Sequence, residues 1–208
     1  MERVLDIYKR PHNADYPVVC MDESPKQLIS TTRQPIPMRC GQPQRMDYEY
    51  IRKGVVNIFI ANEPLAGKRF LQVTQTRKKR DWAYFIRRIC DEFYPNAKRI
   101  TLVMDNLNTH KPSSLYQTFS PCEAKRIWDR FEFIYTPKHG SWLNMAEIEL
   151  HVLNGQCLSR HIDSIEEIEK EVNAWQNHRN NKDSKINWRF TNQQARIKLK
   201  RLYPSIQN

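Results

Sequence analysis

Residues 100–106, which read ITLVMDN, constrain the fold of this chain more than any other stretch. A short apolar run rich in β-branched residues and bounded by turn residues is typical of a buried strand in a largely parallel sheet. Asp105 ends this run. Because open α/β sheets bind their ligands beyond the carboxyl ends of the strands, we expect Asp105 to lie at a functional site.

Two further acids stand in comparable positions. Residues 18–22 (VVCMD) form another apolar run that ends on Asp22, and Glu147 lies in residues 141–147, which read as the start of a helix. Carboxylate oxygens are the ligands that hard divalent cations prefer. An acid at a strand end is by itself more often a turn or cap residue than a ligand. Taken together, two strand-end aspartates and a helical glutamate indicate an oxygen-ligand metal site.

Three motifs surround these acids in order: VVCMDES, VMDNLNTH and TPKHGSWLNMAEIEL. With them, and with WRFTNQQARIKLKRLYP at residues 188–204, the chain resembles over nearly its whole length the catalytic domain of DDE transposases, of the bacterial insertion-sequence branch of the mariner-related superfamily. The resemblance implies catalytic and metal-binding roles for Asp22, Asp105 and Glu147, which would hold two Mg²⁺ or Mn²⁺ ions. It also implies cleavage at transposon ends, strand transfer into target DNA, and a homodimer in the active complex.

Glu147 has a rival in Glu149, which lies about 200° further around a helix, so both cannot face the aspartates. The apolar stripe of this helix runs between the two acids and does not decide between them. The resemblance favours Glu147, which is the acid that follows the Leu-Asn pair. Glu23, next to Asp22, would point to the opposite face of an extended strand and is expected to be structural.

The charge balance favours a nucleic-acid partner. There are 34 Lys and Arg residues against 23 Asp and Glu, a net charge of +11, which suits a polyanion. No apolar run approaches the roughly 20 residues that span a bilayer, and no secretory signal opens the chain. The five cysteines are scattered, with neither metal-binding nor disulfide spacing. We therefore expect a cytoplasmic, nucleoid-associated protein that does not bind membranes.

Basic, aromatic and amide side chains near the acids and in the basic stretches are candidates for contact with DNA. They are Arg77, Lys78, Lys79, Arg80, Asn106, His110, His139, Trp142, Arg189, Lys198, Lys200 and Arg201. Each also has an ordinary structural explanation. The basic run at 77–80 suits a solvated linker, His110 and His139 suit loop or capping positions, and Trp142 suits core packing as well as stacking on a flipped base.

The order of elements predicts an α/β chain, although pattern alone does not separate α/β from α+β. Strands are expected at 18–22, 48–52, 55–60, 69–76, 100–105 and 131–135, with a tight connection at Lys53-Gly54. Helices are expected between the later strands, with Ser141 capping the helix that carries Glu147. The resemblance specifies an RNase H-like fold, in which an antiparallel meander and parallel strands share one sheet flanked by helices.

The expected domain organisation is a lead-in at residues 1–16, the catalytic domain at 17–178, and a basic extension at 179–208 packed on that domain. Relatives carry an amino-terminal DNA-binding region, and residues 1–16 show no helix-turn-helix pattern, so we expect a partial protein. Two alternatives to a transposase stay open. They are a metal-dependent nuclease of the same fold that only cuts, and a non-catalytic DNA-binding remnant.

Overall fold

A single five-stranded sheet organises the chain in this computed structural model, which describes residues 1–33, 36–45 and 49–203. The strand order is β3-β2-β1-β4-β5. The strands are β1 (Val18–Thr31), β2 (Tyr50–Glu63), β3 (Lys68–Thr74), β4 (Ile100–Met104) and β5 (Phe131–Tyr135). β1, β2 and β3 pair in antiparallel fashion, whereas β4 and β5 run parallel to β1. The predicted combination of a meander with parallel strands is confirmed.

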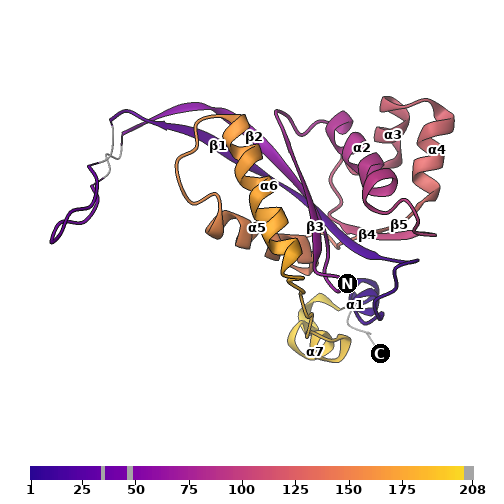
Figure 1. The fold of residues 1–208 in the computed structure, drawn as a ribbon. Coiled ribbons are helices and arrows are strands. Elements are labelled where there is room, and N and C mark those ends of the chain that lie inside the picture. The colour runs from indigo at the N-terminus through magenta and orange to yellow at the C-terminus, as the bar shows by residue number, and fades with distance from the viewer. Residues whose placement is uncertain (34–35, 46–48, 204–208) are drawn as a thin grey trace.

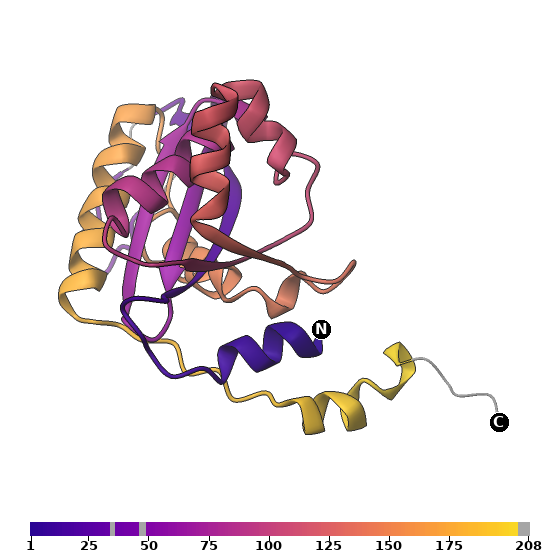
Figure 2. The same cartoon turned by 90° about the vertical axis from the view of Figure 1, so that its right-hand side faces the viewer.

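Helices cover both faces of the sheet (Figures 1 and 2). On one face lie α2 (Lys79–Arg88), which continues into a π-helical turn (Ile89–Phe93), α3 (Pro112–Thr118) and α4 (Pro121–Asp129). On the other lie α5 (Met145–Gln156), α6 (Ile165–Asn181) and the short α1 (Glu2–Tyr8). Each helical layer buries its own apolar core against the sheet, so the sheet separates two cores.

Alternation along β1 determines which face each acid occupies. Val19 and Met21 pack into the core under α2, whereas Cys20 packs into the core under α5. Because successive side chains of a strand point to opposite faces, Asp22 faces the α5 side and Glu23 faces the α2 side. The buried strand β4 ends immediately before Asp105.

Two predicted strand boundaries are wrong. β1 does not stop at Asp22 but continues to Thr31, because its second half pairs with β2, with Pro25 opposite Asn57. Lys53-Gly54 is not a turn but lies inside β2, where the register shifts beside Leu28 and Gly54 takes a φ of 128° that glycine tolerates. The predicted strand at 48–52 includes Tyr48, which lies outside the described residues. β1 and β2 thus continue as a two-stranded arm beyond the sheet (Figure 1).

The carboxyl-terminal helix α7 (Asn192–Lys198) and the following 3-10 turn (Lys200–Leu202) lie beside α1 (Figure 2). Arg196 pairs with Glu2 at 2.8 Å, and the Tyr203 hydroxyl donates to the same carboxylate at 3.0 Å. Asn192 donates to Asp6 at 2.7 Å. Both ends of the described chain are therefore joined by polar contacts. Across residues 1–33, 36–45 and 49–203, no helix combines the length and the apolarity that crossing a membrane requires.

Candidate active site

The three predicted acids come together at one edge of the sheet. β4 pairs with β1 only over Val18 to Cys20, so Asp22 lies just beyond this pairing while Asp105 directly follows β4. Parallel strands bring their carboxyl ends to the same edge, and Glu147 reaches that edge from the first turn of α5. Burial raises the pKa of Asp22 to about 7, and the nearby negative charges of Glu23, Asp105 and Glu147 also act to raise it.

Asn144 connects the start of α5 to the strand that carries Asp22. Its side-chain oxygen accepts from the backbone N–H of Ala146 at 3.1 Å and caps the helix, while its Nδ2 donates to the Met21 carbonyl at 2.8 Å. The same Nδ2 lies 3.4 Å from Asp22 Oδ2. Asn144, and not Ser141 as predicted, is the cap, because Ser141–Leu143 forms a separate 3-10 turn. One buried amide thus fixes Glu147's helix relative to Asp22.

His110 contacts Asp105, the second of the three acids. Its Nδ1 lies 2.6 Å from Asp105 Oδ1, and its Nε2 lies 3.1 Å from Glu23 Oε2. The ring is fully buried and stacks on Trp82 at 5.7 Å between centroids. Burial acts to lower the pKa of His110, but the hydrogen bonds to Asp105 and Glu23 outweigh it and raise the pKa to about 9. The imidazolium therefore bridges two carboxylates, one from β1 and one from the residue that follows β4.

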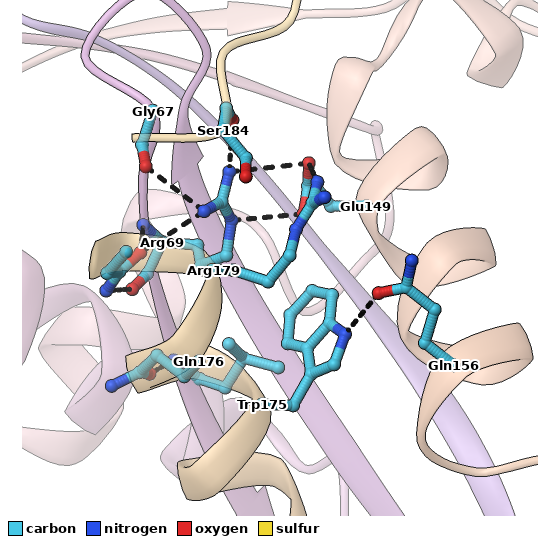
Figure 3. Close-up of polar contacts among 10 residues, drawn as sticks. Gly67, Arg69, Glu149, Gln156, Trp175, Gln176, Arg179 and Ser184 are labelled. Atoms are coloured by element: carbon cyan, nitrogen blue, oxygen red, sulfur yellow. Dashed lines mark hydrogen bonds and ion pairs between the residues drawn. The ribbon is translucent and has the colours of Figure 1, made fainter. Parts of the chain in front are cut away.

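Glu149 belongs to a buried ion-pair network (Figure 3). Its carboxylate contacts Arg69 Nε at 3.0 Å and Arg179 Nη2 at 2.8 Å, and both Glu149 and Arg69 are 1 % exposed. Arg69 also donates to the carbonyls of Gly67 and Ser184, at 3.1 and 2.6 Å. Since Glu149 faces β3 and α6, the opposite side of α5 presents Glu147 to the aspartates.

A second contact secures the far end of the same helix. Gln156 at the end of α5 accepts from Trp175 Nε1 at 2.9 Å, and Trp175 belongs to α6 (Figure 3). Gln176, next to it, accepts from the backbone N–H of Leu71 in β3 at 2.7 Å. α5 is thus held to α6 at both ends, through Glu149–Arg179 and Gln156–Trp175, while Gln176 holds α6 to β3.

The donor set suits a hard cation such as Mg²⁺ or Mn²⁺. Asp22 and Glu147 have no Lys or Arg partner among the described residues, and Asp105 is paired only with His110 on one oxygen, so uncompensated negative charge collects at this edge. Over residues 1–33, 36–45 and 49–203, no group of three His, Cys, Asp or Glu side chains has an arrangement that could hold a metal ion as it stands. Mg²⁺ is usually bound through one or two carboxylates and completes its coordination with water and substrate phosphate.

The residues predicted to contact DNA differ in how far their side chains are exposed to solvent. Asn106, His139 and Trp142 are exposed, and Trp142, 41 % exposed, packs edge-on against Phe190. His139 and Trp142 line a cavity together with Leu202 and Tyr203 near the carboxyl-terminal end of the described chain. The basic candidates are exposed or half-buried. They lie just before α2, in its first turn and in the carboxyl-terminal segment: Arg77, Lys78, Lys79, Arg80, Arg189, Lys198, Lys200 and Arg201. His110 differs, because complete burial leaves it no surface with which to contact DNA.

Sequence reasoning did not assign the roles of Asn144 and of the Glu23–His110 pair. Asn144 lies in the motif TPKHGSWLNMAEIEL, directly after Leu143. An Asn just before a predicted helix is a capping signal that the sequence shows. No local signal could pair His110 with Glu23, because the two residues are 87 positions apart and meet only through the β1–β4 pairing.

The strand order, the flanking helices and the acids at one sheet edge define an RNase H-like fold. A family model described as DDE superfamily endonuclease matches residues 17–169, which is most of the chain. The chain therefore belongs to the DDE superfamily of endonucleases. No curated protein matches the sequence.

Solved structures of the Mos1 transposase share this fold. The Mos1 mariner paired-end complex with Mn matches with a TM-score of 0.60 and 16 % identity, over 88 % of this chain and 54 % of that chain. The Mos1 strand transfer complex matches with a TM-score of 0.57 and 16 % identity, over 84 % of this chain and 50 % of that chain. The chain thus spans about half the length of the solved proteins that it matches.

Proposed function

We propose that this chain is the catalytic domain of a DNA transposase, of the bacterial insertion-sequence branch of the mariner-related superfamily. The observation that carries the proposal is the meeting of Asp22, Asp105 and Glu147 at one sheet edge while the rival Glu149 is neutralised by two arginines. Family membership and the likeness to Mos1 complexes with transposon ends support the same assignment.

The three acids would hold two Mg²⁺ or Mn²⁺ ions. When bound, such ions activate the attacking oxygen and stabilise the leaving oxygen of a phosphodiester. Asp22 and Asp105 would approach the ions from neighbouring strands, and Glu147 from the helix side. His110 orients Asp105 by engaging one of its oxygens, which leaves the other free, and Asn144 fixes the distance between Asp22 and α5.

The reaction has two phosphoryl-transfer steps. Water attacks the phosphodiester at the transposon end, the P–O bond to the 3′ oxygen breaks, and that oxygen leaves as a free 3′ hydroxyl after taking up a proton. The 3′ hydroxyl then loses its proton and attacks a target phosphodiester. A P–O bond to the transposon end forms, the P–O bond to the 3′ oxygen of the target strand breaks, and that oxygen leaves as a 3′ hydroxyl after taking up a proton. The partners are therefore transposon-end and target DNA, with the protein acting as a homodimer at the nucleoid in the cytoplasm.

Metal-dependent nicking of a labelled duplex tests the proposal. The native protein and the surface control Asp129→Asn are expected to cut in Mn²⁺ or Mg²⁺, whereas Asp105→Asn loses cutting and keeps its fold. Cutting by Asp105→Asn at the native rate would show that the acid assignment is wrong. Joining of a pre-cut end separates a transposase from a nuclease that only cuts. Salt-sensitive binding without any cutting by the native protein would favour the non-catalytic remnant.

A further inference from the structure

A polar groove continues from the three acids along β1 and α5. α5 runs beside β1 in the same direction, since Asn144 contacts Asp22 at one end and Lys26 donates to the Leu158 carbonyl at the other. Between these two contacts lies a cavity of about 230 Å³. The groove therefore begins two residues beyond Asp22 on β1 and one helical turn beyond Glu147 on α5.

One wall of the groove is the strand β1 and the other is the helix α5. The polar lining follows from the spacing of residues that share one face of each element. On the strand, Ser24 and Lys26 share a face with Asp22, because alternate residues of a strand point the same way. On the helix, His151 and Asn154 follow Glu147 by four and seven residues and share its face. They lie about 6 and 10 Å beyond Glu147 along the helix axis. The same two faces that carry the acids thus carry the groove.

The chemistry of this lining suits an anion. The groove is lined by an amine, an imidazole, an amide and a hydroxyl, and by no carboxylate. Within the described part of the chain, Lys26 pairs with no acid, and the side chains of Ser24, His151 and Asn154 make no hydrogen bond. Ile58, Leu150, Leu153 and Leu158 supply the apolar remainder of the surface. Donors that no carboxylate neutralises, beside an apolar floor, match a sugar–phosphate backbone.

We propose that this groove binds the backbone of the DNA strand that is cut, at a phosphate next to the scissile one. Lys26 neutralises this phosphate, while His151 and Asn154 contact its oxygens and the deoxyribose packs on the apolar floor. The inference rests on the proposed function for the identity of the strand. It adds a subsite that sets the direction in which the strand leaves the acids.

Equilibrium binding in Ca²⁺ tests the groove separately from cleavage, on a fluorescent DNA duplex that carries one nick. Lys26→Gln is compared with Lys170→Gln, an exposed lysine of α6, and His151→Ala with His178→Ala, an exposed histidine of α6. Lys26→Gln is expected to weaken binding and to reduce the slope of log K against log salt by about 0.9, the value for one phosphate contact. Neither control changes the slope, and thermal melts establish that all four variants are folded.

Neutral methylphosphonates placed one at a time around the nick locate the contacted phosphate. At one position the substitution weakens binding of the native protein and of both controls, but has no further effect on Lys26→Gln or His151→Ala. If the losses in binding from the methylphosphonate and from the protein substitution add at every position, the groove does not contact the phosphate. An unchanged salt slope for Lys26→Gln would also overturn the proposal. Binding of inorganic phosphate with no methylphosphonate effect would assign a free phosphate and overturn the DNA assignment. Failure of the native protein to cut in Mn²⁺ would instead count against the proposed function, because the Ca²⁺ measurements do not depend on cleavage.

Discussion

Nδ1 of His110 lies 2.6 Å from Oδ1 of Asp105, and the opposite ring nitrogen contacts Glu23 at 3.1 Å. A fully buried imidazole thus links the second acid of the site to the residue that follows the first. Partners that orient metal ligands in this way tune both the geometry and the affinity of the site.

His110→Ala should weaken the binding of Mn²⁺ at the acids. Loss of the ring frees Asp105 to rotate, so the Mn²⁺ concentration for half-maximal cutting should rise about 10- to 100-fold, the usual effect of removing such a partner. Mn²⁺ titration of cutting, together with direct Mn²⁺ binding followed by electron paramagnetic resonance, measures this. His110→Gln, which can keep one hydrogen bond, should recover part of the affinity. Equal Mn²⁺ binding by native protein and His110→Ala would contradict the positioning role.

Glu147→Gln and Glu149→Gln should have opposite effects. Glu147→Gln removes a proposed metal ligand that is half-exposed, so cutting is lost while the free energy of unfolding changes little. Glu149→Gln leaves the buried Arg69 without its carboxylate and should lower the free energy of unfolding by about 3–5 kcal/mol. Urea unfolding and cutting assays on both variants separate the two roles. An inactive, fully stable Glu149→Gln protein beside an active Glu147→Gln protein would reverse the assignment.

Asn144→Ala should reduce stability and activity together. The substitution removes the cap of α5, which costs about 0.5–2 kcal/mol, and it releases the tether to Met21 and Asp22. Asn144→Ser can still cap the helix but is too short to tether it. We therefore expect the serine variant to recover stability, measured by urea unfolding, without recovering cutting. Full activity of the serine variant would show that the tether is dispensable.

The contact between the two ends of the chain should contribute less to stability at low pH. Hydrogen bonds from Arg196 and Tyr203 lower the pKa of Glu2 from 4.5 to about 2. A carboxyl whose pKa is lower in the folded state stabilises that state above the unfolded pKa, and this contribution disappears as the pH falls through the folded pKa. Arg196→Gln should therefore be less stable than native protein at pH 7, and the difference should shrink between pH 4.5 and 2. A difference that stays constant over this range, in urea unfolding at each pH, would contradict the pairing.

The sequence predicted the sheet well where a strand is short and buried. β4 and β5 appear as predicted because an apolar run bounded by turn residues has few alternatives, and the meander follows from alternating runs. β1 and β2 are longer than predicted. The outer half of β1 is largely polar and contains Pro25, and the outer half of β2 is exposed and contains Gly54. Pairing between the two strands, rather than burial of either, makes them regular.

The sequence by itself determined that Asp22 and Asp105 each end an apolar run and that Glu147 stands near the start of a helix, since strand and helix periods are local properties. The spacing of residues along α5 left open which glutamate faces the aspartates; the resemblance favoured Glu147, and the tertiary structure supplies the physical reason. Glu147 and Glu149 flank the same apolar stripe, and the choice follows from Arg69 and Arg179, which come from β3 and α6. The same holds for His110, whose burial between Glu23 and Asp105 requires β1 and β4 to pair. A buried charge must find its partner across the fold, and spacing along one element cannot specify a partner that another element supplies.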